Sequence, residues 1–209
     1  MKKGIGLSLL IAAVCFSFNP PSKVKLPAGC DYAGTSKMRE SYLYEAFDED
    51  ADGVRAIVNA VGLSQNFVVL QGDVPNATAT VLWNEKHKAY DRMIVVNSLW
   101  LAGLREKYGK WAALTVLAHE IGHHLGGHTI NSGNDKLKER EADRFAAFTL
   151  AKMGATADEA LLAINSLSAD DPTDGIHWPK YHRWLFTREA WQNAHGMNGI
   201  PNDGKKYVP

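Results

Sequence analysis

Cysteine is scarce in this chain, and neither sign of charge dominates it. The 209 residues include two cysteines, Cys15 and Cys30, and 23 basic residues balance 23 acidic ones. If Cys15 leaves with a leader segment, Cys30 is the only remaining thiol and no internal disulfide can form. The zero net charge predicts no basic surface, so no nucleic acid partner is expected. The chain is 45% hydrophobic and long enough to bury one sizeable core.

The apolar stretch near the N-terminus is too short to span a bilayer comfortably. It follows Lys2 and Lys3 and runs over Ile5–Phe18, which is the order of charged and apolar regions in a secretory signal peptide. We therefore predict a signal peptide over residues 1–22 and a mature protein that is periplasmic or secreted. Ala12–Cys15 has some similarity to a lipoprotein cleavage box, although its valine is large for that position. Membrane attachment is expected only if this cysteine is lipidated.

One stretch, TVLAHEIGHHLGGH from Thr115 to His128, contains the pattern H-E-x-x-H. On a helix, His119 and His123 are one turn apart, so both imidazoles can reach the same metal ion. Glu120 projects to the side of that pair, where it can accept a proton from a zinc-bound water without being a ligand. The flanking residues are mostly apolar, and burying three ionisable groups together is costly without a metal. We therefore predict one Zn²⁺ per chain at this helix.

Two histidines leave zinc short of a third protein ligand, and two solutions predict different residues. The extended pattern H-E-x-x-H-x-x-G-x-x-H requires a histidine at position 129, where the chain has Thr129. His128 misses this register by one residue and would reach the metal only through a distorted turn at Gly126 and Gly127. The other solution takes Glu139 from a following helix, with Asp143 on the same face accepting a hydrogen bond from a ligand histidine. Glu141 points about 200° away from Glu139, so both cannot bind one metal.

These segments together resemble a known family. HEIGHHLGGH followed by EREADRFAAFTLAKMGA is similar to the gluzincin metallopeptidases that include the CAAX prenyl protease and the bacterial heat-shock membrane protease, particularly their small, secreted, single-domain relatives. Upstream, GDVPNATATV and RMIVVNSLWL resemble the active-site sheet of that family. Downstream, DGIHWPKYHRWLFTREAW resembles its His-Pro segment, with a tryptophan inserted before the proline. The resemblance implies a zincin-like fold in which His119, His123 and Glu139 bind zinc, Glu120 is the catalytic base and Asp143 supports a ligand.

The periodicity of apolar residues predicts an α+β domain at residues 38–195, mainly helical, with a short sheet beside the H-E-x-x-H helix. Residues 23–37 are expected to be a linker and residues 196–209 a flexible tail. Helices are predicted at Ser41–Phe47, at Val54–Val61 after an acidic start, and at Ser98–Tyr108, Trp111–Gly126, Lys136–Met153, Ala157–Leu167 and Tyr181–Ala194. Strands are predicted at Phe67–Leu70, Ala77–Trp83 and Arg92–Asn97, with a polar turn at Asn84–Asp91.

Two segments are candidates for handling the substrate. Ile94, Val95, Val96 and Asn97 are predicted to form a sheet edge that binds an extended peptide through main-chain hydrogen bonds, although an ordinary core strand has the same pattern. In the last segment, His177 is the first choice for stabilising the oxyanion, or for acting as an extra zinc ligand that keeps the enzyme latent. Tyr181, His182, Arg183 and Arg188 are alternatives, and packing roles explain all five equally well.

We therefore expect an exported zinc metalloendopeptidase that acts on unfolded or envelope polypeptides, with Glu120 and His177 as catalytic residues. Two other classes stay open. A zinc-binding quality-control module would hold misfolded envelope proteins without cutting them, and an intact Glu120 argues against it. A zinc hydrolase acting on a compound other than a peptide would show the same motif.

Overall fold

The protein is a mixed α/β molecule in a computed structural model, which describes residues 22–26, 29–32, 34–36, 39–130, 135–166 and 177–196. Its strands are β1 (Ser22–Leu26), β2 (Gly29–Asp31), β3 (Gly34–Ser36), β4 (Arg39–Glu45), β5 (Val68–Gln71), β6 (Ala77–Asn84) and β7 (Ala89–Val96). Its helices are α1 (Asp48–Ala60), α2 (Ser98–Tyr108), α3 (Lys110–Leu125), α4 (Asp135–Lys152), α5 (Ala157–Ala160), α6 (Leu162–Asn165) and α7 (Lys180–Ala194).

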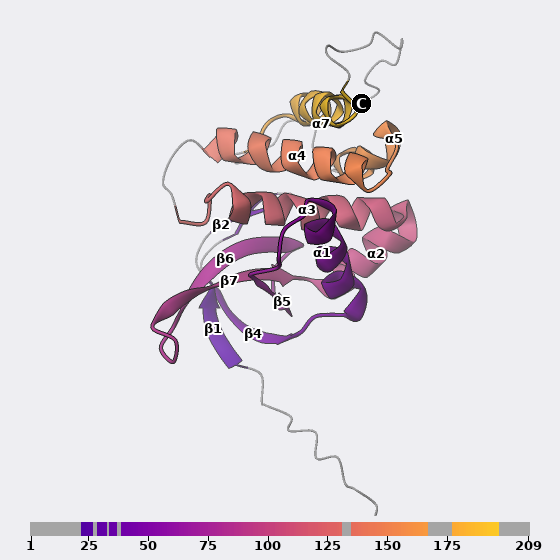
Figure 1. The fold of residues 1–209 in the computed structure, drawn as a ribbon. Helices are drawn as coiled ribbons and strands as arrows, with labels where there is room; N and C mark the ends of the chain where they lie inside the picture. The colour runs from indigo at the N-terminus through magenta and orange to yellow at the C-terminus, as the bar shows by residue number, and fades with distance from the viewer. Residues whose placement is uncertain are drawn as a thin grey trace, which may run out of the picture.

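Five strands form one sheet in the order β1-β4-β5-β7-β6, and β2 pairs with β3 in a separate hairpin. All neighbours in the large sheet are antiparallel except β5 and β7. The helices are stacked on one side of this sheet: α3 lies next to the strands, α4 lies on α3, and α7 lies on α4 (Figure 1). The helix that carries H-E-x-x-H is therefore held between the sheet and the next helix.

The core lies on both faces of β7. Ile94 and Val96 point into the larger apolar cluster with residues of α1, α2 and α3, whereas Val95 points to the opposite face and packs with Leu43. All three β7 side chains are fully buried. This alternation follows from the two-residue period of a strand, and β7 lies inside the sheet between β5 and β6.

Helices α3 and α4 approach each other closely at Gly122. A Cβ atom on this residue would lie 3.0 Å from the Cα of Ala142 and 3.3 Å from its carbonyl oxygen. Only a glycine leaves room for the α4 backbone at that distance. The close packing lets side chains of α3 contact side chains of α4.

Most predicted elements are confirmed, and α2 has the predicted bounds. The prediction of a helix at Ser41–Phe47 is wrong, because β4 occupies most of this segment. Ser41 and Leu43 are buried while Tyr42 and Tyr44 are about half exposed, which is the two-residue alternation of a strand with one covered face. Antiparallel pairing with β1 stabilises the extended form.

The linker predicted at 23–37 is also wrong in part. β1 joins the large sheet as an edge strand, and β2 and β3 form the small hairpin. β1 pairs with a strand that lies further along the chain, and β2 pairs with β3 across a short turn. The composition of a segment does not reveal its strand partner. The predicted signal peptide, including Cys15, and the predicted tail after Gly196 lie outside the described residues. Within the described part of the chain, no helix has the length and apolar character needed to cross a membrane.

Two smaller predictions also change. The helix predicted at Ala157–Leu167 is two short helices, α5 and α6, which meet at Leu161. Thr156 caps α5 in a reciprocal capping box with Glu159, so its start is well defined by the sequence. The predicted turn at Asn84–Asp91 is shorter, because β6 continues to Asn84 and β7 begins at Ala89.

Candidate metal centre

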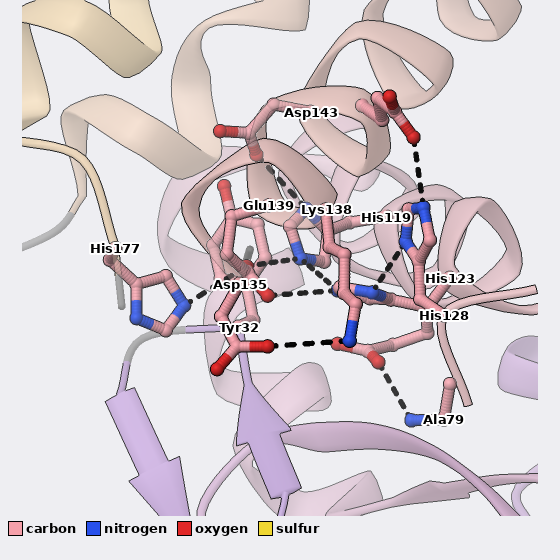
Figure 2. Close-up of polar contacts among 12 residues, drawn as sticks. Tyr32, Ala79, His119, His123, His128, Asp135, Lys138, Glu139, Asp143 and His177 are labelled. Atoms are coloured by element: carbon pink, nitrogen blue, oxygen red, sulfur yellow. Dashed lines mark hydrogen bonds and ion pairs between the residues drawn. The ribbon is translucent and has the colours of Figure 1, made fainter. Parts of the chain in front are cut away.

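Three buried side chains from α3 and α4 converge on one point (Figure 2). His119 Nε2 is 3.0 Å from His123 Nε2 and 3.2 Å from Glu139 Oε2. The other carboxylate oxygen of Glu139 is 3.3 Å from His123 Nε2. The helical spacing of the two histidines and the close helix crossing at Gly122 produce this arrangement together. The predicted grouping of His119, His123 and Glu139 is therefore present, and this buried group could hold a metal ion.

The distances fit a tetrahedral metal ion. Zinc bound at about 2.0–2.1 Å has ligand atoms about 3.3–3.4 Å apart, close to the separations between the three groups. Both oxygens of Glu139 are buried, and their polar neighbours are the imidazole nitrogens of His119, His123 and His177, at 3.1–3.3 Å. A buried carboxylate that faces only imidazole nitrogens is expected to need a cation, and two nitrogens with one carboxylate are a typical zinc donor set.

The charges in this cluster favour a cation as well. Burial alone would lower the pKa of His119, but hydrogen bonds to Asp143 and Glu139 raise that pKa to about 10. Burial would raise the pKa of Glu139, but its contacts with His119, His123 and His177 hold it well below the usual value. Burial lowers the pKa of His123. A positive charge beside Glu139 and Asp143 therefore stabilises the cluster. A proton on His119 can supply this charge, and so can a metal ion that replaces the proton.

Asp143 supports His119, as predicted, and is itself held by Arg183. His119 Nδ1 is 2.9 Å from Asp143 Oδ1. Arg183 donates to both oxygens of Asp143, through Nη2 at 2.7 Å and Nε at 2.8 Å. Burial would raise the pKa of Asp143, but Arg183 and then His119 lower it to about 2. His119 therefore has an ionised, fully buried hydrogen-bond acceptor behind it.

The segment expected to be a linker closes this side of the site. Tyr32, in the turn between β2 and β3, packs its ring edge-on against the ring of His119, with the centroids 5.1 Å apart. Its carbonyl oxygen accepts a hydrogen bond from Arg183 at 3.0 Å, and the guanidinium lies 4.7 Å from its ring centroid. Asn76, just before β6, accepts from the Tyr32 backbone N–H at 3.0 Å. The hairpin is therefore part of the domain.

Glu120 lies between the three-residue group and the sheet. Its side chain is buried, and Oε2 accepts a hydrogen bond from the backbone N–H of Ala79 on β6 at 2.7 Å. A carboxylate held in this way can accept a proton next to the metal position without binding the ion.

His177 reaches the site from the segment before α7. The side chain is buried, and Nε2 is 3.1 Å from Glu139 Oε2. The other candidates from this end of the chain have different surroundings. Arg183 is committed to Asp143, Tyr181 is half exposed, and the ring of His182 packs against Trp178. Arg188 lies over the ring of Trp184, at 5.1 Å.

The predicted edge strand is wrong in its position. Ile94, Val95 and Val96 belong to β7, which pairs with β5 on one side and with β6 on the other, so their main-chain groups are used within the sheet. Asn97 follows the strand and caps α2, accepting from the N–H of Trp100. Consecutive apolar residues occur in central strands as well, so the pattern of this segment did not distinguish an edge strand from a core strand. The edge strand next to the candidate metal centre is β6, whose Ala79 contacts Glu120.

Four residues at the site were not predicted in the roles that they have. Ala79 contacts Glu120 through its backbone N–H, and Tyr32 contacts His119 through its ring. Neither contact follows a recognisable sequence pattern. His128 lies beside His123, and Glu141 lies beside His128. The register of the motif counted against His128 as a metal ligand, and the position of this residue, five after His123, indicates no second role.

No protein-family model matches this chain, and neither a curated protein nor a solved structure matches it.

Proposed function

We propose that this protein is a zinc metalloendopeptidase of the gluzincin type, with a zincin-like fold. The observation that carries the proposal is the convergence of His119, His123 and Glu139 with the buried carboxylate of Glu120 beside them. A purely structural metal site has no use for an additional buried carboxylate that binds no metal. In a hydrolytic site this carboxylate is the general base.

The residues of the chain divide the reaction between them. His119, His123 and Glu139 would hold the zinc ion, which when bound polarises the scissile carbonyl and lowers the pKa of a water molecule. Glu120 takes the proton of the attacking water at its carboxylate and passes it to the leaving amine. The N–H of Ala79 orients Glu120 by donating to Oε2, which holds the carboxylate beside the metal position for proton transfer.

The substrate is proposed to be an extended polypeptide that binds beside β6. Among the strands that the structure describes, β6 pairs with β7 alone. Because the N–H of Ala79 points to Glu120, strand alternation turns the main-chain groups of Val81 and Trp83 to the same outward side. A peptide added there would lie next to Glu120 and would be recognised mainly through its backbone. This mode suits unfolded proteins, because it demands little of their sequence.

His177 is proposed to limit access to this centre. Its Nε2 contacts the same oxygen of Glu139 that faces His119, so the ring lies beside the metal position. We also propose that the protein acts outside the cytoplasm, because Lys2 and Lys3 with the apolar run after them have the pattern of a signal peptide.

Casein cleavage by the zinc-loaded protein tests the proposed function. We expect the wild type to cleave, and Glu120→Gln to bind zinc normally while losing about 10²–10⁴-fold in rate, because the general base is removed. A chelated sample should also be inactive and should recover when zinc is restored.

The opposite results have distinct meanings. Cleavage that survives in Glu120→Gln would contradict the assigned base. A zinc-loaded wild type that does not cleave would make His177→Ala the next variant: activity gained there would support His177 as a latency ligand. If His177→Ala is also inactive, the zinc-binding quality-control module becomes the better description.

A further inference from the structure

The end of α3 turns the chain back toward its own last turn. Gly127 has φ +70°, and its N–H bonds to the carbonyl of His124 at 3.3 Å. The N–H of His128 bonds to the carbonyl of His123 at 2.9 Å. These two bonds form a Schellman motif, in which the residue after the left-handed glycine is fixed beside the helix. The backbone of His128 is thereby attached to the residue that is also a candidate metal ligand.

The side chain of His128 follows the same direction. Its Nδ1 is 3.1 Å from Nδ1 of His123, and its Nε2 is 3.0 Å from Oε2 of Glu141 (Figure 2). The ring lies over Gly126, where a Cβ atom would be 2.7 Å from its Cε1 and 2.9 Å from its Cδ2. A glycine at 126 therefore leaves the space in which the ring reaches His123.

The hydrogen-bond direction in this chain of groups is determined at both ends. If Nε2 of His123 binds a metal, its lone pair is used there, so Nδ1 carries the proton and must donate. Nδ1 of His128 is then the acceptor, which puts the His128 proton on Nε2. Nε2 in turn faces Glu141, whose carboxylate can only accept. Each group thus has one role, and no two donors or two acceptors face each other.

We propose that His128 and Glu141 are positioning residues that orient His123 for metal binding. This role rests on the metal site of the proposed function. His128 would support His123 in the way that Asp143 supports His119. The two supports differ in character. Asp143 is buried with Arg183, whereas the side chain of His128 is 6% exposed and that of Glu141 is 61% exposed, so this second support leads to solvent.

Zinc affinity, measured by competition with a chromophoric chelator, tests the proposal. We expect His128→Ala to bind zinc about 10–100-fold more weakly, the usual effect of removing a hydrogen-bond partner from a ligand histidine. His128→Asn should recover most of this loss, because its side-chain oxygen can accept from Nδ1 of His123. Gly126→Ala keeps every histidine but displaces the ring, so it should resemble His128→Ala. Glu141→Ala should have a smaller effect in the same direction.

Two further measurements distinguish a positioning role of His128 from a role in general stability. The visible absorption of the cobalt-substituted protein reports the geometry at the metal, and it should change in His128→Ala and Gly126→Ala but return toward wild type in His128→Asn. Unfolding of the metal-free variants should change less than unfolding of the metal-loaded ones. His87→Ala, which removes an exposed histidine on the β6–β7 hairpin, is the matched control.

The outcomes also separate this proposal from the proposed function. Wild-type affinity and an unchanged cobalt spectrum in both His128→Ala and Gly126→Ala would overturn the positioning role, whatever the protein does to casein. Weaker metal binding in these variants of a protein that does not cleave casein would support the positioning role while the peptidase proposal fails. A wild type that binds neither zinc nor cobalt would overturn both.

Discussion

Gly122 on α3 lies against the backbone of Ala142 on α4, so close that a Cβ atom would be 3.0 Å from the Cα of its neighbour. This contact brings α3 close enough to α4 for His119 and His123, on α3, to reach Glu139, on α4. We expect Gly122→Ala to force the helices apart and to destabilise the protein by about 1–3 kcal/mol, with weaker zinc binding although every ligand is retained.

Gly103 provides the control for that variant. It lies within α2, and a Cβ atom there would meet nothing within 4 Å. Gly103→Ala should therefore stabilise the protein by about 0.5–1 kcal/mol and leave zinc affinity unchanged. Urea unfolding and chelator competition on both variants make the comparison. If Gly122→Ala behaves like Gly103→Ala, the close crossing has no part in forming the metal site.

Removal of Glu139 should remove the metal. Glu139→Ala leaves two imidazoles as protein ligands, which is too few for a stable zinc site. Metal analysis after gel filtration should show zinc in the wild type and in Glu106→Ala, a variant of an exposed α2 residue, but not in Glu139→Ala. Full zinc occupancy in Glu139→Ala would contradict the assignment of this ligand.

The pair of Asp143 and Arg183 should be strongly coupled. Both side chains are about 2% exposed and joined by two hydrogen bonds, so Arg183→Met leaves a buried carboxylate without its cation, at a cost of about 3–5 kcal/mol. Asp143→Asn should also destabilise. The double variant should lose less than the sum of the single losses, because it has no uncompensated charge. Additive losses in urea unfolding would show that the two residues act independently.

His124 should make stability depend on pH. Burial is the main reason that the pKa of this histidine falls from 6.5 to about 4, and its Nε2 lies 2.8 Å from the Met93 carbonyl. The unfolded chain takes up a proton first, so the stabilisation is complete above pH 6.5 and is lost as pH falls from 6.5 toward 4. Between about pH 7 and about pH 5 the loss should be about 2 kcal/mol.

His124→Gln isolates this effect, because glutamine can donate to the same carbonyl but does not titrate in this range. The free energy of unfolding, measured in urea without metal, should fall between about pH 7 and about pH 5 by about 2 kcal/mol more in the wild type than in the variant. Equal pH dependence in the two proteins would show that His124 does not titrate differently on unfolding.

The β6 edge should be visible in the pattern of substrate hydrogen bonds. In a peptide paired along one strand edge, every second N–H faces the protein. A series of peptides with single N-methyl groups should therefore lose kcat/KM at alternate positions, while the positions between them tolerate methylation. Loss at every position, or at none, would contradict strand pairing at β6.

The grouping of His119, His123 and Glu139 could be predicted from sequence because it depends on local spacing. His119, Glu120 and His123 occupy positions whose directions are set by one helix, and Glu139 and Asp143 occupy one face of the next. The long helices were predicted well for the same reason, since apolar residues recur with a helical period.

The parts that sequence reasoning missed depend on partners far away in the chain. β4 has the alternation of a strand, although its sequence was predicted to begin a helix, and β1 joins the sheet by pairing with β4. Which strand lies at the edge of the sheet depends on the order of all five strands, so β7 and β6 could not be distinguished from their own residues.

The sequence by itself therefore determined the donor set, since the identity and helical spacing of a few residues decide which atoms can bind one metal. Tertiary structure alone decided what surrounds those atoms. The crossing at Gly122, the hydrogen bonds from Arg183 to Asp143, and the return of His128 to His123 are contacts between distant residues or across a helix end. Such contacts are decided by packing, which no local pattern specifies.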